Sequence, residues 1–556
     1  MTAREGFRMT DTPSTMIVTQ SHRGEELGSH PLQEVRDYTP FSLPAEESLV
    51  AAMMGPAFYP HRPSQVTHLE THISHLFFAG DLVYKVKKPV RFSFLDYSAL
   101  RKRKYFLHEE LRLNRRLAPS VYLGVLPISY WQGEWRLGGY SYPAEYTLVM
   151  RRLPARRMLP FLLERDQATP EMMESIAETL APFHGQAETG DKIAAYGHPQ
   201  ALRKLWEDNL ADIEPFVGGL FDIDAWETFR DFGARFMDKH EGLLLRRVRE
   251  GRVREVHGDL HCEHICFAPE GIQIFDCVEF NFGLRCCDVA SEVAFLLMDL
   301  EFRGAGDLGR RFLKRYLELA RDPELSLLLP FYKCHRALVR GKVAALSPDG
   351  LSSHAARYFD YARRVTWEES KPFLVLVCGL TGSGKSTLAR ALAQRLGFTL
   401  ISSDATRKSL SKSLNRRQVP YGQDIYAPSM TERTYAKMVD AAEKLVQKGE
   451  GAILDATFHQ RARREPIFAL AAKHNVPTIW IHCVSREEVT QERLRRRLEE
   501  RQDLSDGRWE IYLKQKSAFE PLEEVPREVC LSLDTEAPPE KLVRSVERFI
   551  HTAVPW

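Results

Sequence analysis

The sequence predicts two folded domains in series, an α+β domain at residues 46–370 and an α/β domain with a parallel sheet at residues 371–556. The length of 556 residues exceeds the roughly 250–300 residues that one hydrophobic core organises. The first region opens with strand-like runs and continues with mostly helical patterns, whereas the second alternates apolar strands with helices. Segregated strands and helices indicate an α+β domain, and alternation indicates a parallel sheet covered by helices.

The composition is that of an ordinary globular protein, with 44% hydrophobic and 27% charged residues. The net charge of +2 is small beside 77 basic and 75 acidic residues, so no nucleic-acid partner is expected. The nine cysteines are scattered, which favours reduced thiols over a disulfide framework. The opening residues lack the apolar core of a secretory signal, and no stretch approaches the roughly 18 apolar residues of a membrane span. We therefore expect a cytoplasmic protein without a membrane partner, whose oligomeric state the composition leaves open.

Residues 1–45 are polar and lack a sustained hydrophobic periodicity, so we expect a flexible tail there. Residues 46–155 are expected to form a small lobe rich in strands, because apolar runs alternate with turn residues. Its predicted elements are a helix near 46–55, two strands within 71–90 around the Gly80–Asp81 turn, a helix over 97–117 and a strand over 145–153.

Residues 156–370 carry mostly helical patterns and are expected to form a larger lobe. Two short strands interrupt the helices, one in "VREVHGD" (253–259) and one in "IQIFDCVEF" (272–280). The stretch 346–372 is expected to contain a closing helix and the junction to the second domain.

The second domain opens with the apolar strand "PFLVLVCGL", followed by "GLTGSGKS" and a helical run. This context completes the phosphate-binding loop G-x-x-x-x-G-K-[ST], whose glycines let backbone N–H groups face a phosphate chain. Lys385 adds positive charge near the β- and γ-phosphates, and Ser386 offers a hydroxyl to Mg²⁺. We expect ATP and Mg²⁺ as cofactors, with nucleotide contacts from Gly379, Leu380, Thr381, Gly382, Ser383, Gly384, Lys385, Ser386 and Thr387.

Further candidate residues follow this loop. "FTLISSDATRKSL" predicts a second strand that ends on Asp404, with Arg407 three residues later, and "GAILDATF" predicts a third strand that ends on Asp455. Parallel sheets bind ligands at the carboxyl ends of their strands, so both acids are candidate site residues. A predicted helix over 485–501 carries three arginines that could reach a phosphate chain or form a solvated helix face: Arg493, Arg496 and Arg497.

With these residues the second domain resembles small P-loop kinases of the gluconate kinase, polynucleotide kinase and zeta-toxin type. The resemblance implies that Asp404 orients or deprotonates an acceptor hydroxyl and that Arg407 holds an anionic group of the substrate. It also implies a place beside Mg²⁺ for Asp455, and stabilisation of charge on the transferring phosphoryl group by Lys385, Arg493 and Arg497.

The first domain carries a second ordered set of charged residues, namely Lys85, Glu110, Asp259 and Asp276. Asp259 lies in "HGDLH" and Asp276 in "IFDCVEF", and two acids this close on a turn-and-strand unit suit one Mg-ATP site. Lys87 competes with Lys85 because the two lie on the same strand face, and Glu109 competes with Glu110.

This order resembles the aminoglycoside phosphotransferase-like branch of the protein-kinase fold. The resemblance implies that Lys85 pairs with nucleotide phosphates, that Glu110 holds this lysine in place, and that 145–153 forms the hinge beside the adenine. It further implies that Asp259 orients the acceptor hydroxyl and that Asp276 binds a metal ion.

The residue five positions after Asp259 is His264, where such kinase loops carry a metal-binding Asn. One hypothesis is a structural zinc site among the nearby His and Cys residues, although no C-x₂-C pair is present. A second hypothesis is an inactive scaffold that has lost its second metal ion. A third is an active variant in which His264 hydrogen-bonds to the Asp259 carboxylate and orients it, a role that suits imidazole better than binding Mg²⁺. We favour the third hypothesis.

The order of the two domains resembles bacterial fusion proteins that join an aminoglycoside phosphotransferase-like domain to an ATP-binding P-loop domain. We therefore expect an ATP- and Mg²⁺-dependent phosphotransferase with two nucleotide sites that phosphorylates hydroxyl groups of small molecules. The acceptor is left open, because the acceptor pocket varies between kinases that share one fold. Two alternatives stay open: a nucleotide-gated regulatory or scaffold protein with an inactive upstream domain, and a nucleic-acid end kinase.

Overall fold

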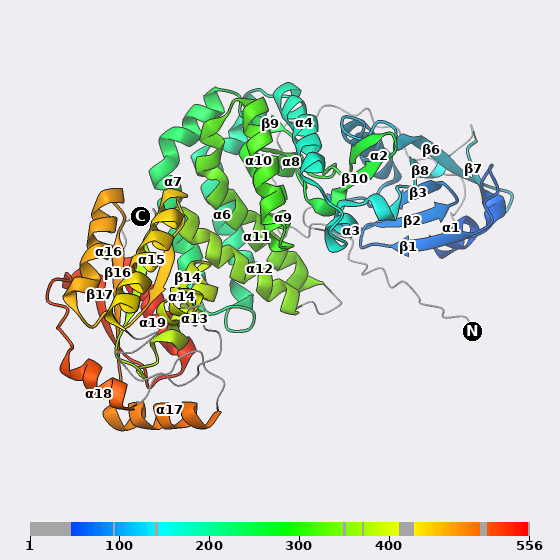
Figure 1. Ribbon diagram of the computed structural model, residues 1–556. Helices are drawn as coiled ribbons and strands as arrows, with labels where there is room; N and C mark the ends of the chain where they lie inside the picture. The colour runs from blue at the N-terminus through cyan, green and yellow to red at the C-terminus, as the bar shows by residue number, and fades with distance from the viewer. Residues whose placement is uncertain are drawn as a thin grey trace. The chain divides into compact units, whose positions relative to one another are not determined.

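The computed structural model describes residues 46–92, 95–139, 143–347, 352–369, 372–410, 427–500 and 509–553 (Figure 1). The expected tail at 1–45 lies outside these residues. By their internal contacts, residues 1–362 and 363–556 form two compact units. The division therefore comes a few residues before the expected boundary at 370/371, because Trp367 already belongs to the hydrophobic core of the second unit.

The first unit begins with a six-stranded antiparallel sheet in the order β1-β2-β3-β8-β6-β7. Its strands are β1 (Val66–Glu70), β2 (Ser74–Ala79), β3 (Leu82–Lys87), β6 (Tyr122–Trp131), β7 (Glu134–Leu137) and β8 (Pro143–Arg151). The strands predicted on either side of Gly80 are confirmed, and Gly80 has a φ of 64°, which only glycine adopts without strain. Strands β1, β6 and β7 were not predicted from the sequence. In β6, two register irregularities in the pairing with β8 blur the alternation that identifies a strand.

Two helices accompany this sheet, α1 (Glu46–Met53) and α2 (Leu100–Asn114), with the short strand pair β4 (Arg91–Phe92) and β5 (Leu95–Asp96) before α2. Both helices match the predictions. The buried face of α1 packs with Phe77, Tyr84 and Val149 of the sheet in one hydrophobic cluster. The buried face of α2 packs through Leu107 against β6 and β8. The sheet and α2 thus hold the charged residues of β3 and α2 close together.

The rest of the first unit is mostly helical, as predicted (Figure 1). Its helices are α3 (Leu159–Glu164), α4 (Pro170–Gln186), α5 (Asp191–Ala194), α6 (Pro199–Ile213), α7 (Ile223–Arg249), α8 (Phe282–Arg285), α9 (Val289–Phe302), α10 (Gly306–Ala320), α11 (Leu329–Leu346) and α12 (Ser352–Val365), whose last residues enter the second unit. Helix α9 is buried along almost its whole length, so it forms the centre of this helical part.

Four short strands lie among these helices, in two separate pairs. One pair is formed by β9 (Val253–Glu255) and β12 (Cys286–Asp288), and the other by β10 (Ile265–Ala268) and β11 (Gly271–Ile274). The predicted strands at 253–259 and 272–280 are therefore present but shorter than expected, and they do not pair with each other. Each ends where the chain turns into a loop that carries an acidic candidate residue.

The second unit is built on a five-stranded parallel sheet in the order β14-β15-β13-β16-β17, as the alternating pattern predicted. Its strands are β13 (Leu374–Cys378), β14 (Thr399–Ser402), β15 (Ala452–Asp455), β16 (Thr478–Val484) and β17 (Cys530–Asp534). Its helices are α13 (Lys385–Leu396), α14 (Ser403–Leu410), α15 (Pro428–Gln447), α16 (Arg461–His474), α17 (Glu487–Glu500), α18 (Trp509–Ser517) and α19 (Pro539–Ala553).

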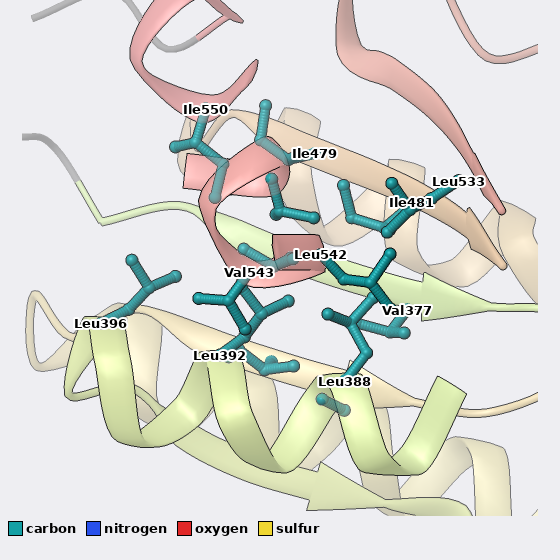
Figure 2. Close-up of a cluster of buried hydrophobic side chains, with 14 of the residues drawn as sticks. Val377, Leu388, Leu392, Leu396, Ile479, Ile481, Leu533, Leu542, Val543 and Ile550 are labelled. Atoms are coloured by element: carbon teal, nitrogen blue, oxygen red, sulfur yellow. The ribbon is translucent and has the colours of Figure 1, made fainter. Parts of the chain in front are cut away.

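Two hydrophobic clusters cover the two faces of this sheet. Figure 2 shows the first cluster, in which Leu388, Leu392 and Leu396 follow one side of α13 at four-residue spacing. They meet α19 residues such as Val543 and Ile550 against the central strands. This packing fixes the start of α13 beside the end of β13, and so places the phosphate loop at the carboxyl edge of the sheet.

Within the described residues, we find no helix with both the length and the apolar content needed to cross a membrane.

Candidate functional site

The first unit holds a charged network between β3 and α2. Lys85 Nζ donates to Glu110 Oε1 at 2.7 Å and lies 3.4 Å from Asp276 Oδ1. Lys87, two residues along the same strand, donates to the other oxygen of Glu110 at 2.8 Å and to Glu279 at 2.6 Å. Both lysines therefore meet the buried Glu110, which explains why the strand pattern alone could not separate them.

The two lysines differ in what they can reach. Lys85 lines a cavity of about 880 Å³, whereas the side chain of Lys87 is fully buried between two carboxylates. Burial opposes the charge of each ammonium group, but Glu110 raises the pKa of both well above the ordinary lysine value. Lys85 is thus placed to meet a ligand, and Lys87 is placed to hold Glu110.

The two candidate glutamates of α2 are also distinguished by their surroundings. Glu110 is fully buried and faces Lys85, as the sequence suggested. Glu109 instead accepts hydrogen bonds from Arg112 at 2.7 Å and from Arg285 at 2.9 Å. The competing residue therefore has a structural explanation of its own.

The loop between β9 and β10 places Asp259 and His264 on the same cavity. His264 Nδ1 lies 2.8 Å from the main-chain oxygen of Asp259, whereas its distance to the Asp259 carboxylate is 3.7 Å. The expected hydrogen bond from His264 to the carboxylate is therefore not formed. The imidazole binds the backbone instead, because the single 3₁₀ turn over 262–264 brings the ring within hydrogen-bond distance of the Asp259 carbonyl oxygen.

This hydrogen bond determines the tautomer of His264. A carbonyl oxygen only accepts, so Nδ1 carries a proton, and in the neutral imidazole Nε2 keeps a lone pair. Nε2 lies 3.5 Å from Asp276 Oδ2. Asp276 has a φ of 64°, an uncommon conformation for a residue other than glycine, and its N–H donates to the Tyr122 hydroxyl at 3.2 Å.

The pair formed by His264 Nε2 and Asp276 fits a divalent metal ion. Metal-ligating imidazoles commonly donate their other N–H to a carbonyl oxygen, as His264 does to Asp259. Two neighbouring ligand atoms about 2.1 Å from one ion lie about 3.0–3.4 Å apart, close to the observed 3.5 Å. An Asn side chain offers the same combination of one N–H donor and one electron-pair donor. The histidine therefore offers the same two kinds of group at this position of the loop.

Asp259 itself is almost completely buried. Burial opposes its negative charge, but the neighbouring His261 holds the pKa of its carboxyl group well below the usual range. His257 N–H at Nε2 donates to the Phe275 carbonyl at 2.8 Å, and its Nδ1 accepts from the Asp259 N–H at 3.3 Å. Burial lowers the pKa of His257 to about 4, so this ring is neutral and supports the loop.

The structure does not support the cysteine-containing zinc site. Within the described part of the chain, the metal-competent group in this region consists of Asp259, His261 and His264 and includes no thiol. Cys277 Sγ instead donates to the His257 carbonyl at 3.1 Å, and burial raises the pKa of this thiol to about 12. The cysteines near this loop are therefore buried thiols within the fold.

Glu292, which was not predicted from the sequence, holds the backbone of the loop before Asp259. Its carboxylate accepts from the N–H groups of Gly258 at 2.6 Å and His257 at 3.1 Å, and contacts His184 Nε2 at 2.9 Å. The signal was available, because Glu292 is an acid within the mostly apolar run of helix α9. A buried carboxylate of this kind needs several hydrogen-bond donors, and here they come from the loop.

In the second unit, the phosphate loop has the expected backbone. Gly379, Gly382 and Gly384 all have positive φ angles, and a Cβ atom on Gly379 would come within 2.5 Å of the Cys483 carbonyl oxygen. Lys385 begins α13, and its Nζ lies 3.4 Å from the Leu380 carbonyl oxygen. The N-terminal N–H groups of α13 therefore face the loop, as phosphate binding requires.

Asp455 lies at the end of β15, as predicted, and is almost fully buried. One of its carboxylate oxygens has no hydrogen-bond partner in the structure. Burial raises its pKa, while Lys385 and a hydrogen bond with Ser386 act in the opposite direction. An unsatisfied buried carboxylate oxygen beside a Ser hydroxyl fits Mg²⁺, which prefers oxygen ligands.

Asp404 lies on helix α14, two residues after the end of β14, rather than at the end of the strand itself. It forms an ion pair with Arg407 at 3.0 Å, so the two predicted substrate residues lie together. On α17, Arg493 donates to the Thr535 carbonyl at 2.6 Å beside Gly384, and Arg497 lies one helical turn later. Asp404 was misplaced because strand and helix patterns overlap at such a short connection.

Comparisons with known proteins match both units. The family described as "Phosphotransferase enzyme family" matches residues 88–327, and the family described as "AAA domain" matches residues 374–522. An uncharacterized protein of Mycobacterium tuberculosis is 30% identical over 432 residues, which are 76% of this chain and 85% of that protein.

Shorter matches are to kinases. A shikimate kinase of Thermobifida fusca is 33% identical over 111 residues, which are 19% of this chain and 63% of that enzyme. The match to the solved structure of a gluconokinase of Sinorhizobium meliloti covers 33% of this chain and 92% of the gluconokinase chain, with 18% identity and a TM-score of 0.24.

Proposed function

Because the chain belongs to the family of fusion proteins in which a phosphotransferase-family domain precedes a P-loop kinase-type AAA domain, we propose that it is an ATP-dependent phosphotransferase with two nucleotide sites. The observation that carries this proposal is that Lys85, Asp259, His264 and Asp276 all line one cavity of about 880 Å³. They come from segments far apart in the sequence, and together they bring a cation, two carboxylates and an imidazole to one cavity.

In the first site, Lys85 holds the phosphates of ATP, and Glu110 keeps its ammonium group in position at 2.7 Å. The Asp259 carboxylate faces the acceptor and receives the proton of the attacking hydroxyl. The hydrogen bond from His264 to the Asp259 backbone helps to hold Asp259 in position. Arg152 and Leu153 also line the cavity, and their main chain would meet the adenine ring.

In the second site, the backbone N–H groups of the loop from Gly379 to Ser386 surround the phosphates, and Lys385 adds charge. Asp404 orients the acceptor hydroxyl, and Arg407 beside it binds an anionic group of that acceptor. Divalent metal ions, held by Asp276 and His264 in the first site and by Ser386 and Asp455 in the second, would neutralise charge on the phosphates. Small molecules with hydroxyl groups are the acceptors that we propose for both sites.

The test uses the full chain and γ-labelled ATP with a panel of small metabolites. Asp259→Asn should remove the products of the first site, and Lys385→Ala should remove those of the second. Asp307→Asn and Lys444→Ala are matched controls, because both residues are exposed and lie on helices outside the sites. Each control should leave every product unchanged.

The same experiment separates the competing functions. ATP hydrolysis without any phosphorylated product would indicate a nucleotide-gated regulatory protein. Products that are lost in Lys385→Ala but unchanged in Asp259→Asn would indicate that the first domain is an inactive scaffold. If oligonucleotide ends are labelled and no small molecule is labelled, the protein is a nucleic-acid end kinase.

A further inference from the structure

The loop that carries Asp259 also contains a histidine that the proposed transfer does not use. His261 is fully buried, and among the residues that the structure describes neither of its ring nitrogens has a hydrogen-bond partner. Buried polar atoms are nearly always paired, so two unpaired nitrogens on one buried ring require an explanation. The atoms nearest to this ring supply one, because they are of the kinds that bind metal ions.

Three ligand atoms converge beside this histidine. His261 Nε2 lies 3.6 Å from Asp259 Oδ2, and His264 Nδ1 lies 3.7 Å from the same oxygen. The ligand atoms of the three residues all lie within 4.8 Å of one another. Ligands of one tetrahedral zinc ion, at about 2.0–2.2 Å from the metal, are about 3.3–3.6 Å apart. The two observed separations are therefore too long for hydrogen bonds and close to those of two zinc ligands.

Each of the two histidines also has a carboxylate at its other nitrogen. His261 Nδ1 lies 3.9 Å from Glu263 Oε2, and His264 Nε2 lies 3.5 Å from Asp276 Oδ2. An imidazole that binds a metal ion usually donates its remaining N–H to a carboxylate or a carbonyl oxygen. Both rings are thus placed to bind an ion with one nitrogen and to be held by a carboxylate at the other.

An ion can reach this position from the large cavity of the first site. Asp259 and His264 line that cavity, and His261 is buried beside them. Three protein ligands leave the fourth position of a tetrahedral ion open to water or to another ligand in the cavity. The arrangement is therefore that of an open zinc site and not of a closed structural one.

The ligand set also selects the kind of ion. Two imidazoles and one carboxylate suit Zn²⁺, whereas Mg²⁺ prefers oxygen ligands. For His264 Nδ1 to bind zinc, its proton must move to Nε2, which faces Asp276, and its hydrogen bond to the Asp259 carbonyl group must break. With the proton on Nδ1, the Nε2 lone pair faces Asp276 instead. His264 therefore cannot serve both metal positions at once.

We propose that Asp259, His261 and His264 form a zinc site, and that zinc bound there inhibits the first site. The inhibition rests on the proposed function of that site, whereas the binding of zinc does not. Zinc on Asp259 Oδ2 occupies the carboxylate that receives the proton of the acceptor hydroxyl. It also holds His264 in the tautomer whose Nε2 has no lone pair for the metal ion of the nucleotide.

The first test measures binding of zinc chloride to the full metal-free chain by calorimetry, with Co²⁺ as a spectroscopic substitute. One zinc ion should bind at this site, and bound Co²⁺ should show the intense visible absorption of a four-coordinate ion. His261→Leu removes one ligand and should weaken zinc binding by about a hundredfold or more, whereas Glu263→Gln keeps all three ligands and should weaken it by about tenfold. His108→Leu, at an exposed position on α2, is the matched control and should leave zinc binding unchanged.

The second test measures labelled transfer at constant Mg-ATP and buffered free Zn²⁺. Zinc should suppress the products that Asp259→Asn removes and spare those that Lys385→Ala removes. The zinc concentration that halves the transfer should rise in His261→Leu by the same factor as the dissociation constant.

The outcomes separate the zinc site from the proposed function. Unchanged zinc affinity in His261→Leu, or the weak absorption of a six-coordinate Co²⁺ ion, would overturn the site. Zinc that binds there without suppressing transfer would overturn its inhibitory role. If the chain binds zinc as expected and phosphorylates no acceptor even without zinc, the zinc site stands and the proposed function fails.

Discussion

At the scale of single residues, His264 determines how the first site differs from a kinase loop with Asn. Its Nδ1 proton holds the Asp259 backbone, and its Nε2 lone pair faces Asp276. A nitrogen ligand beside a carboxylate suits Mn²⁺ better than it suits Mg²⁺, which prefers oxygen. His264, which stands where such kinase loops carry a metal-binding Asn, therefore predicts a metal preference shifted from Mg²⁺ towards Mn²⁺.

We predict that His264→Asn keeps at least part of the activity of the first site, because Asn offers the same donor and an oxygen ligand. The preference for Mn²⁺ over Mg²⁺ should fall by about tenfold or more. His264→Ala removes both groups and should lose more activity. Electron paramagnetic resonance of Mn²⁺ titrations measures binding without turnover, with Asp455→Ala as the background, because this change removes the proposed metal ligand of the second site. An unchanged metal preference in His264→Asn would contradict this role.

In the second site, Asp404→Asn should lower acceptor phosphorylation by about a hundredfold, because it removes a positioned acid–base group. ATP affinity should change little, since the proposed partner of Asp404 is the acceptor hydroxyl. Product formation and ATP binding are measured separately, by labelled transfer and by calorimetry. A loss confined to ATP affinity would assign Asp404 to the metal or the nucleotide instead.

At the scale of elements, strand β3 carries two lysines on one face, one placed to bind a ligand and one with a structural role. Lys85 reaches the cavity and meets Glu110 and Asp276, whereas Lys87 is enclosed between Glu110 and Glu279. A strand with period two necessarily aims both side chains the same way. Only the depth of each position beneath the sheet and α2 separates the ligand-binding lysine from the structural one.

We predict that Lys87→Met destabilises the first unit by about 3–5 kcal/mol, because it leaves the buried Glu279 carboxylate without its cation. Lys85→Met should destabilise it less, since Glu110 keeps its bond to Lys87, and should instead abolish activity of the first site. Denaturant unfolding and labelled transfer give the two readouts. Lys88→Met is a nearby control, because Lys88 pairs with the largely exposed Glu70. Equal stability losses in Lys85→Met and Lys87→Met would contradict the assignment of a ligand-binding role to Lys85 and a structural role to Lys87.

At the scale of the whole molecule, the chain holds two units, each with its own hydrophobic core and its own candidate nucleotide site. A ligand that binds only the folded state stabilises the unit that contains its site, by about 2.7 kcal/mol at a concentration of one hundred dissociation constants. Two sites in two cores should therefore respond to nucleotide separately.

We predict two unfolding transitions in calorimetry, both raised by a few degrees when Mg-ATP is added. Lys385→Ala should cancel the rise of one transition, and Lys85→Met should cancel the rise of the other. If one variant cancelled both rises, the nucleotide would bind a single site.

The sequence by itself determined the features that contiguous residues encode. The phosphate loop with its glycines and Lys385, the apolar strand before it and the order of the two domains all follow from local spacing. Asp259 and Asp276 were also found this way, because each lies in a short recognisable stretch. The alternating pattern likewise predicted the parallel sheet of the second unit, although the strands β1, β6 and β7 of the first unit were missed.

The tertiary structure alone decided which residues meet across long distances in the chain. Lys85 and Asp276 are 191 positions apart, and Arg336 and Gly258 are 78 positions apart, so no local pattern links them. The choice of Lys85 over Lys87 and the hydrogen bond of His264 to a backbone carbonyl both depend on such contacts. Burial and hydrogen bonding are properties of the packed chain, because the same side chain is neutral or charged, paired or unpaired, according to the segments that fold against it.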